Sequence, residues 1–369
     1  MKSNKGKALF LPFMQIPTGH HHVAEALMDE LNKSNHSIQS EKVDILAYSY
    51  GKLERIVSST YLLWIRFIPH TYNWMYDQVA NSELTSNRKI LFEFLFLSFF
   101  KRLIKETKPE ILFCTHALPS YLAGRLKSTH NLSAIIVNVY TDYFVNNIWG
   151  IDGIDYHIVP SVQVKFHLIR KGVKEQNIFV TGIPVHGAFY PKPIAFQTNK
   201  INILVTGGSL GIGDIDELLP HKSSLKNLHY YVLCGKNKRL YETLKNRRNI
   251  RITPIPYINN KQEMNRIYDK VDAVLTKPGG VTVSECLKKK KVIFISNTLP
   301  GQERINLDQL KYLGLVIPIN LHNQPVENQI VSFFSSKSRR RQYQANMERY
   351  HSSLENKSMI EILDLIIKK

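Results

Sequence analysis

The sequence predicts an α/β protein that contains two parallel sheets of about six strands each. Short apolar runs rich in Val, Ile and Leu alternate with helical segments along the 369 residues. Uninterrupted runs of this kind are typical of strands whose two faces are both buried in a parallel sheet. Twelve such runs exceed what one doubly wound sheet comfortably holds, so two sheets are the simpler arrangement.

The expected strands form two groups of six, and helical patterns separate most of them. In the first half of the chain they cover residues 8–13, 43–46, 110–116, 134–142, 156–160 and 178–184. In the second half they cover residues 201–208, 230–235, 250–256, 273–280, 291–297 and 315–319. This alternation of strand and helix signals favours strands that all run in the same direction.

A domain boundary is expected near residues 182–200, which show little periodicity and contain three prolines. We therefore expect a first domain at residues 1–187, a second domain at 188–337 and a C-terminal helical segment at 338–369. A terminal helix of this length can cross back and pack on the first domain. Its apolar stripe consists of Met359, Ile360, Ile362, Leu363, Ile366 and Ile367.

Composition argues against a secreted, membrane-spanning or zinc-stabilised protein. The three cysteines are far apart and lack the spacing of a metal site, and so few cysteines fit a reducing compartment. The N-terminal apolar run at residues 8–16 is broken by Pro12 and lacks a cleavage site, which favours a buried strand over a signal peptide. No window reaches the roughly 18 apolar residues of a membrane span. We expect a cytoplasmic protein that associates peripherally with the inner face of the cell membrane.

The net charge of +19 is uneven, because residues 1–190 contribute +5 and residues 191–369 contribute +14. Such a field attracts nucleotides, nucleic acids and acidic lipid surfaces, and charge alone does not choose among them. No nucleic-acid-binding module is recognisable, so we expect no nucleic-acid partner. We interpret the basic run Lys288–Lys291 as a solvated face. For Arg339–Arg341, a solvated helix start and a contact with acidic lipid remain alternatives.

Residues 52–105 interrupt the α/β pattern with many aromatic side chains and no strand signal. Two interpretations remain open. The segment forms helices that complete the core of the first domain, or it forms amphipathic helices that settle at the headgroup boundary of a membrane. Both can hold for different faces of the same helices. Basic residues flank the second aromatic run, as the membrane interpretation requires. The candidate acceptor-binding or membrane-facing residues are Trp64, Phe67, Tyr72, Trp74, Phe96 and Phe100.

Two glycine-rich turns in the second half are candidates for phosphate binding, because such turns present backbone N–H groups and a helix N-terminus to an anion. The first is "LVTGGSLGIGD" at residues 204–214, a pattern found at the start of nicotinamide-binding dehydrogenases. Here it lies in mid-chain, and the next strand, "YYVLCG", has no acidic residue at its tip for a ribose hydroxyl. A dinucleotide site is therefore disfavoured.

The second turn is "TKPGGVTVSECLKKKK" at residues 276–291, which opens a helix near Val281 or Thr282. The N–H groups of its first turn face the carboxyl edge of the sheet, where open α/β sheets bind ligands. Glu285 lies one turn further and can accept hydrogen bonds from the 2′- and 3′-hydroxyls of a ribose. The polar groups that follow the next strand suit sugar hydroxyls better than phosphate; they are Gln302, Glu303 and Asn306.

The segments "TKPGGVTVSE" and "LPGQERIN" resemble the C-terminal domain of UDP-sugar-using transferases of the two-domain GT-B type. The similar families are monogalactosyldiacylglycerol synthases, bacterial diacylglycerol glucosyltransferases and, more distantly, the enzyme that adds N-acetylglucosamine to the peptidoglycan lipid precursor. Weaker resemblances occur in the expected order at "TGHHHVAEAL", "YLLWIRFIPHTYNWMYD", "VYTDYFVNNIW" and "VTGIPV". The resemblance implies two Rossmann-like domains that face each other across a cleft, and a transfer that inverts anomeric configuration without a metal.

The resemblance also assigns roles to individual residues. It implies that His20 is the first candidate for the general base and Asp142 the second. A capping or phosphate-contact role for His20, and a strand-end cap or orienting role for Asp142, remain alternatives. The implied donor-binding residues are Gly207, Gly208 and Ser209 at the phosphates, Tyr257 and Ile258 at the uracil, Pro278, Gly279, Gly280, Val281 and Thr282 at the pyrophosphate, Glu285 at the ribose, and Gln302 and Glu303 at the sugar, with Asn306 in support.

The resulting expectation is an inverting glycosyltransferase that moves a hexose from a UDP-sugar to a diacylglycerol-type lipid at an anionic membrane surface. The UDP-sugar is a co-substrate, and neither a cofactor nor a metal is expected. Two alternatives remain: a transferase that acts on a soluble or other lipid-linked acceptor, and a non-catalytic, membrane-associated protein that binds nucleotide sugars.

Overall fold

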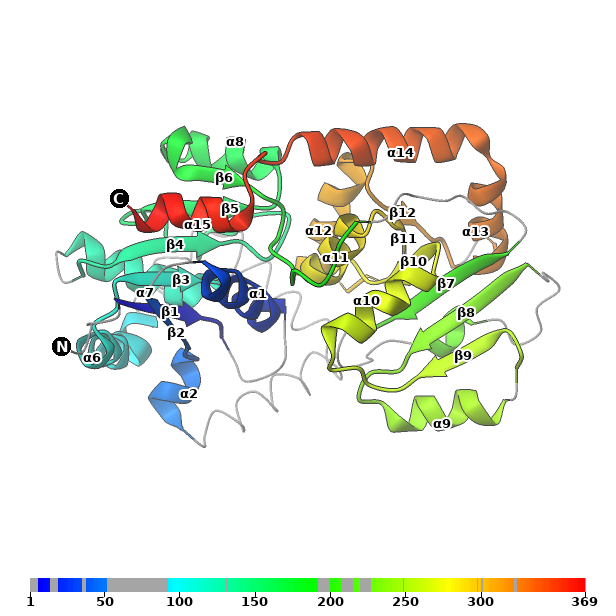
Figure 1. Ribbon diagram of the computed structural model, residues 1–369, viewed down its shortest axis with the longest axis horizontal. Helices are drawn as coiled ribbons and strands as arrows, with labels where there is room; N and C mark the ends of the chain where they lie inside the picture. Colours follow the sequence, from blue (N-terminus) through cyan, green and yellow to red (C-terminus); the bar gives the residue numbers. More distant parts are fainter. Residues whose placement is uncertain are drawn as a thin grey trace. The chain divides into compact units, whose positions relative to one another are not determined.

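The chain forms two compact units in the computed structural model (Figure 1). The first unit contains Met1–His186, Pro300–Gln302 and Ser353–Lys369, and the second contains Gly187–Leu299 and Glu303–Ser352. The structure describes residues 6–13, 19–34, 38–51, 92–129, 132–191, 200–207, 215–219, 227–247, 249–296, 298–299, 301–321 and 324–368.

The first unit holds a six-stranded sheet in the order β2-β1-β3-β4-β5-β6, and all paired strands are parallel. Its central strands are buried along their whole length, as expected for a sheet covered on both faces. The strands are β1 Gly6–Leu11, β2 Ile38–Lys42, β3 Ile111–Cys114, β4 Ile135–Val139, β5 Tyr156–Val159 and β6 Ile178–Val180.

One expected strand is wrong. Residues 43–46 were expected to be extended, whereas the structure has the strand at Ile38–Lys42 and starts helix α2 (Ile45–Tyr50) directly after Asp44. Asp44 caps this helix, because its carboxylate accepts hydrogen bonds from Leu46 N (2.8 Å) and Ala47 N (3.3 Å). Strand β2 pairs only with β1 at the edge of the sheet, and such a strand needs no continuous apolar run.

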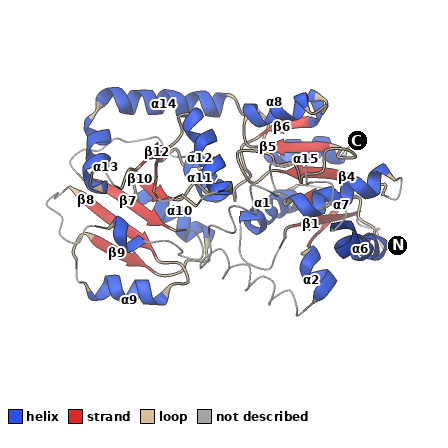
Figure 2. Cartoon of the chain, turned by 180° about the vertical axis from the view of Figure 1, so that it is seen from behind, coloured by secondary structure: helices blue, strands red, loops and turns tan. Residues whose placement is uncertain are grey.

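Helices flank the strands of the sheet (Figure 2). The amphipathic helix α1 buries Val23, Leu27 and Leu31, among others, on one side. The helices of the first unit are α1 Gly19–Lys33, α2 Ile45–Tyr50, the π-helix η1 Glu93–Leu97, α6 Ser98–Thr107, α7 Ala117–Ser128, α8 Val162–Arg170, the short η2 Glu175–Asn177 and α15 Met359–Ile367.

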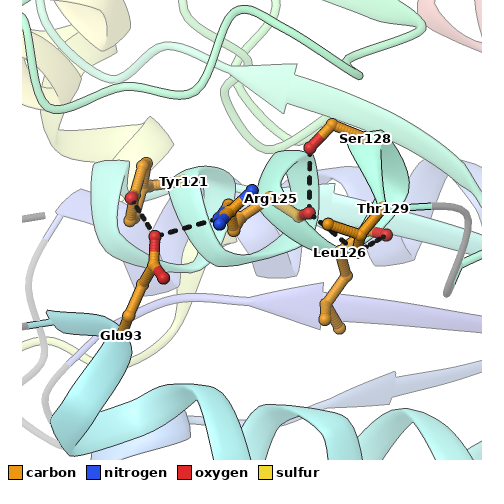
Figure 3. Close-up of polar contacts among 6 residues, drawn as sticks. All are labelled: Glu93, Tyr121, Arg125, Leu126, Ser128 and Thr129. Carbon is orange, nitrogen blue, oxygen red and sulfur yellow. Dashed lines mark hydrogen bonds and ion pairs between the residues drawn. The ribbon is translucent and has the colours of Figure 1, made fainter. Parts of the chain in front are cut away.

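Hydrogen bonds attach η1 to helix α7 (Figure 3). The carboxylate of Glu93 accepts from the Tyr121 hydroxyl (2.5 Å) and from Arg125 Nε (3.1 Å). Helix α7 ends where the hydroxyls of Ser128 and Thr129 donate back to the Arg125 carbonyl, at 2.9 and 3.2 Å. The bonds from Glu93 hold η1 against α7, the helix that follows β3.

The two described aromatic candidates are core residues, which corrects their assignment to a membrane-facing surface. Phe96 and Phe100 are both buried, and the Phe96 ring meets Phe13 and Tyr50 edge to face. The neighbouring Phe94 instead exposes 82% of its surface. Sequence periodicity did not show which aromatic positions point inward. The other candidates, Trp64, Phe67, Tyr72 and Trp74, lie outside the described residues.

The second unit holds a six-stranded parallel sheet in the order β12-β11-β10-β7-β8-β9. The prediction of two parallel six-stranded sheets is thereby confirmed. The strands are β7 Ile201–Thr206, β8 Leu228–Leu233, β9 Ile252–Ile255, β10 Ala273–Thr276, β11 Val292–Ile295 and β12 Ile317–Pro318. The helices are the short η3 Ile215–Leu218, then α9 Lys238–Asn246, α10 Lys261–Lys270, α11 Gly280–Lys288, α12 Gln302–Tyr312, α13 Val326–Ser335 and α14 Lys337–Ser352.

The C-terminal segment is divided between the two units. Helix α14 belongs to the second unit, where the Tyr343 hydroxyl lies 3.0 Å from the carbonyls of both Lys291 and Leu315. Helix α15 belongs to the first unit, buries Ile362, Leu363 and Ile366, and packs against α1, as predicted for the terminal helix. The segment 338–369 was expected to pack towards the first domain; residues 353–369 belong to the first unit, and the part up to Ser352 belongs to the second.

Within the described residues, the helices are too short or too polar to cross a membrane. The described part of the chain also contains no group of three or more His, Cys, Asp or Glu side chains placed to hold a metal ion.

Candidate functional site

Each sheet has a topological switch point at its first strand. The chain adds the next strand or strands on one side of this first strand and then adds the later strands on its other side. In the first unit this strand is β1, between β2 and β3, and in the second it is β7, between β8 and β10. In open α/β sheets, ligands bind at the carboxyl ends of the strands beside such a switch point. The segments that follow β1, β3 and β4, and those that follow β7 and β10, are therefore the candidate sites.

In the second unit, the switch-point helix α11 begins without a side-chain cap. Its N-cap is Gly279, with φ −76° and ψ 132°, which makes no side-chain cap hydrogen bond. The first N–H groups of a helix have no partner within the helix, and they carry the positive end of its dipole. The segment from Pro278 to Thr282 therefore remains the candidate anion site of the second unit.

The backbone at Gly279 is open as well as uncapped. Its φ angle is one that any residue adopts, so the turn itself does not require glycine. A Cβ atom added there would meet no described atom within 4 Å. Within the described residues, neither conformation nor packing requires a glycine here, and the bare backbone allows the close approach of a bulky anion.

Glu285 lies one turn into α11 and is held by a neighbour from helix α10. The buried Tyr268 hydroxyl donates to Glu285 Oε2 at 2.8 Å. Burial and the adjacent carboxylate raise the pKa of Tyr268 well above its ordinary value, so the phenol keeps its proton and remains a donor. The structure thus fixes the carboxylate predicted to bind a ribose.

The predicted sugar-binding residues at the start of α12 are not equally accessible. Glu303 Oε2 accepts from the backbone N–H of Leu299 at 2.7 Å, which fixes the preceding turn. Asn306, one turn further along α12, is buried. Gln302, which the structure groups with the first unit, donates from Nε2 to Asp142 Oδ2 at 2.6 Å.

The remaining donor candidates follow β7 and β9. Gly207 directly follows β7, whereas Gly208 and Ser209 lie outside the described residues. Tyr257 and Ile258 follow β9, and the exposed Tyr257 ring lies 5.6 Å from Lys236 Nζ. Lys236 follows β8, so a cation and an aromatic face meet at the carboxyl edge of this sheet.

The basic run Lys288–Lys291 is only partly solvated, which corrects the interpretation of an exposed basic face. Lys288 is exposed, but Lys289 is completely buried and donates to Asp269 Oδ1 (2.6 Å) and Asn265 Oδ1 (2.7 Å). Lys291 is also buried and donates to the Val271 carbonyl at 2.8 Å. Partners from α10 and the segment after it draw these ammonium groups inward, and a single-helix pattern cannot show such partners.

In the first unit, His20 lies in the first turn of α1 and is bonded to the ends of two other strands. Its Nδ1 lies 2.7 Å from the Thr115 carbonyl, after β3, and 3.0 Å from Thr141 Oγ1, after β4. These bonds cross the carboxyl edge of the sheet, and none of the described ones caps α1 itself. The geometry therefore favours a positioned imidazole over a capping residue.

The hydrogen bonds also fix the tautomer of His20. A carbonyl oxygen only accepts, so Nδ1 carries the proton and Nε2 of the neutral ring keeps its lone pair. Burial lowers the pKa of His20, although the Asp142 carboxylate and the bond to Thr115 oppose that shift. The positive end of α1 further disfavours an imidazolium. At neutral pH the ring is consequently a base at Nε2.

A second histidine at this edge was missed by the sequence analysis. His116 caps α7, because its Nδ1 accepts from Leu118 N at 3.2 Å, and its ring meets His20 edge to face at 4.9 Å. Burial and the neighbouring His20 lower the pKa of His116 well below its ordinary value, so it stays neutral. Its position, directly after a buried strand and before a helix, was the signal that could have identified it.

Asp142 lies close to this pair and follows β4. Its carboxylate acts on His20 through charge and accepts the hydrogen bond from Gln302. The structure therefore brings together His20 and Asp142, the two candidates for the base, and adds Thr115, His116 and Thr141 around them. An orienting role for Asp142 agrees with this arrangement.

Family models match both units. A monogalactosyldiacylglycerol synthase model matches residues 20–185, and the glycosyltransferase family 28 C-terminal domain matches residues 202–351. Among curated proteins, the chain is 41% identical over 366 residues to the uncharacterized glycosyltransferase YkoN of Bacillus subtilis, covering 98% of this chain and 97% of that protein. It is 28% identical over 288 residues to a processive diacylglycerol beta-glucosyltransferase of Bacillus cereus, covering 75% of this chain and 70% of that protein.

Solved structures share the fold along the whole chain. MurG of Acinetobacter baumannii superposes with a TM-score of 0.63 at 16% identity, covering 99% of this chain and 100% of that one. UGT2 of Phytolacca americana, solved with UDP-2-fluoro-glucose and pterostilbene, gives a TM-score of 0.60 at 10% identity and covers 100% of both chains. Together with the two family models and the 41% identical relative, these similarities show that the chain belongs to the GT-B glycosyltransferases of the monogalactosyldiacylglycerol synthase and family 28 type.

Proposed function

We propose that the protein transfers a hexose from a UDP-sugar to a diacylglycerol-type lipid, with inversion of the anomeric configuration. The observation that carries the proposal is the uncapped N-terminus of α11 at the switch point of the second sheet, with Glu285 one turn further. The relatives named processive diacylglycerol beta-glucosyltransferases support the choice of acceptor.

In the proposed donor complex, backbone N–H groups from Gly280 to Thr282 bind the diphosphate, and Glu285 accepts hydrogen bonds from the ribose hydroxyls. Tyr257 and Ile258 flank the uracil beyond β9, and Gly207, Gly208 and Ser209 are the candidates for further phosphate contacts. Gln302 and Glu303 contact the hexose, and the buried Asn306 supports their turn. Backbone amides and a helix dipole supply positive potential without a counter-cation.

In the proposed reaction, the acceptor hydroxyl oxygen attacks the anomeric carbon of the donor sugar. The bond between that carbon and the diphosphate oxygen breaks, and UDP leaves with the electron pair. His20 Nε2 accepts the proton of the acceptor hydroxyl as the new bond forms. Because this is a single displacement, the configuration inverts. The N–H groups of α11 stabilise the charge of the leaving diphosphate, so we propose no metal for this step and expect full activity in EDTA.

A lipid acceptor requires the protein to reach a membrane surface, and we propose an anionic, cytoplasmic one reached peripherally. The net charge of +19 attracts such a surface. In the described part of the first unit, helix α6 adds exposed Lys101, Arg102 and Lys105 close to the exposed Phe94. Binding to vesicles that contain phosphatidylglycerol should weaken sharply between 0.05 and about 0.5 M salt, and binding that is indifferent to salt would remove this part of the proposal.

Thin-layer analysis tests the function directly. Diacylglycerol vesicles are incubated with labelled UDP-glucose or UDP-galactose, and the lipid fraction is separated. A labelled glycolipid that forms with wild-type protein but not with His20→Asn supports the proposal. Label that appears only in a water-soluble acceptor would replace the lipid acceptor by a soluble one, and binding of UDP-sugar without any transfer would leave a non-catalytic protein.

A further inference from the structure

Helices α10 and α11 are joined by two sets of polar contacts that are buried or partly buried. Asn265, Tyr268 and Asp269 have the helical spacing that places them on one side of α10. Their partners on α11 are Glu285 and Lys289, four residues apart. The Tyr268 hydroxyl donates to Glu285 Oε2 at 2.8 Å, and Lys289 Nζ donates to Asn265 and Asp269 at 2.7 and 2.6 Å.

Burial makes both contacts costly to break. Tyr268 is 1% exposed and Lys289 is completely buried. A buried hydroxyl or ammonium that loses its acceptor forfeits its hydrogen bond without regaining water. Helix α11 is therefore held against rotation and sliding, and the Glu285 carboxylate keeps a defined position relative to the uncapped first turn of the same helix.

The segment that opens the second unit covers these contacts. The buried Phe189 ring meets the Tyr268 ring edge to face, with centroids 5.6 Å apart at 81°. The next residue, Tyr190, places its ring 4.5 Å from Lys289 Nζ. Each of the two contacts thus has its own aromatic neighbour, Phe189 beside Tyr268 and Tyr190 beside Lys289.

We infer that Tyr268 is a positioning residue for donor binding, which holds the Glu285 carboxylate in the orientation that accepts the ribose hydroxyls. This inference rests on the proposed function, because it assumes that a uridine nucleotide occupies the α11 site. A ribose contact is made equally in the ground state and the transition state, so its loss raises KM and leaves kcat unchanged.

The test variant is Tyr268→Phe in the full-length protein, which keeps the ring and removes the hydroxyl. Loss of one hydrogen bond predicts a rise in the KM for UDP-glucose of about 2- to 13-fold, with kcat unchanged. Tyr190→Phe is the matched control, because it removes a hydroxyl from a ring in the same layer that is 52% exposed. We expect Tyr190→Phe to behave like the wild type.

A second measurement separates positioning from a general loss of structure. Titration calorimetry compares UDP with 2′-deoxy-UDP, and the ratio of the two dissociation constants is independent of the fraction of protein that is folded. Wild-type protein should prefer UDP, and Tyr268→Phe should reduce that preference by the same factor by which its KM rises. In a Glu285→Gln background, Tyr268→Phe should add no further loss of preference, because the carboxylate through which it acts is gone.

Three outcomes would overturn the inference. Equal weakening of UDP and 2′-deoxy-UDP binding by Tyr268→Phe would show a structural role only. A fall in kcat without a rise in KM would place the effect in the chemical step. Failure of wild-type protein to bind UDP at all would refute the donor proposal itself, and this result is distinguishable because it appears before any substitution is made.

Discussion

The carboxyl edges of the two sheets use different chemistry. In the first unit the edge is built mainly from side chains, with His20 in contact with Thr141, His116 and the Thr115 carbonyl, and with Asp142 nearby. In the second unit the switch point instead presents bare backbone at Gly279 and the uncapped start of α11. A neutral imidazole with a free lone pair is suited to move a proton, whereas aligned N–H groups are suited to hold a stationary negative charge. The same topology thus supports two separate tasks.

The largest expected effect is on kcat, when the residue proposed to accept the proton is replaced. His20→Asn removes the proposed base and should lower kcat by about 10²- to 10⁴-fold, while the dissociation constant for UDP stays unchanged. His22→Asn, on the same helix but partly exposed and beside Glu25, is the matched control and should keep wild-type kcat. Steady-state kinetics and UDP titration measure the two quantities. If His20→Asn lowered the affinity for UDP by as large a factor as kcat, the proton transfer and the diphosphate binding would not be assigned to separate sheet edges.

The second largest effect is expected on UDP binding, when a negative charge is placed at the start of α11 in the second unit. Gly279→Asp caps α11, and the open space around this position accepts the side chain, so thermal stability should hold or rise slightly. The new carboxylate repels a diphosphate and should weaken UDP binding by about 10- to 100-fold.

Gly279→Ser provides the neutral counterpart, since serine caps the helix without adding charge. It should lose much less affinity for UDP than Gly279→Asp. Equal affinities in the two variants would mean that the diphosphate binds elsewhere. Melting temperatures measured alongside exclude unfolding as the cause of any loss.

A smaller effect concerns Asp142, the second candidate for the base. The Asp142 carboxylate raises the pKa of His20 against the effect of burial, so Asp142→Asn should lower that pKa further. Activity requires unprotonated His20 and is lost as pH falls, so the acidic limb of kcat/KM should move to lower pH in the variant. At pH 8 the variant should lose less than the roughly 10²-fold expected when a general base is removed. A larger loss with an unchanged acidic limb would make Asp142 the base.

The smallest effect concerns stability in the first unit. His157 lies in strand β5, completely buried beside the Tyr140 hydroxyl (3.0 Å), and burial lowers its pKa from 6.5 to about 4. Between these two pKa values the unfolded chain binds a proton at His157 that the folded chain does not. The contribution of neutral His157 to the free energy of unfolding is therefore intact above pH 6.5 and is lost as pH falls towards 4.

Urea unfolding at pH 7 and pH 5 measures this contribution. The free energy of unfolding lost between the two pH values should be about 2 kcal/mol smaller in His157→Gln than in the wild type. Parallel losses in the two proteins would show that His157 is protonated in the folded state.

The comparison of the two edges also shows what the sequence alone can predict. Buried parallel strands produce continuous apolar runs, so most of the strands were recognisable, as was the glycine turn before α11. The edge strand Ile38–Lys42 was missed because it has a neighbour on one side only and few apolar residues. The backbone site was thus easier to predict than the side chains around it.

Contacts between distant segments account for the other differences. The burial of Lys289 depends on Asn265 and Asp269 on another helix, which a local charge pattern does not show. The inward orientation of Phe96 and Phe100 depends on packing against Phe13 and other core residues. His116 carries no motif of its own, and although its place between a buried strand and a helix was a local signal, its contact with His20 follows only from the pairing of β3 with β1.

Proton NMR of the glycolipid product tests the central claim most directly. Wild-type protein is incubated with diacylglycerol and UDP-α-glucose or UDP-α-galactose, and the anomeric signal of the purified lipid is assigned. The account predicts a β-linked hexosyl diacylglycerol, because one displacement with His20 as base inverts the α-linked donor. An α-linked product, or the absence of any glycolipid when UDP binding is intact, would contradict it.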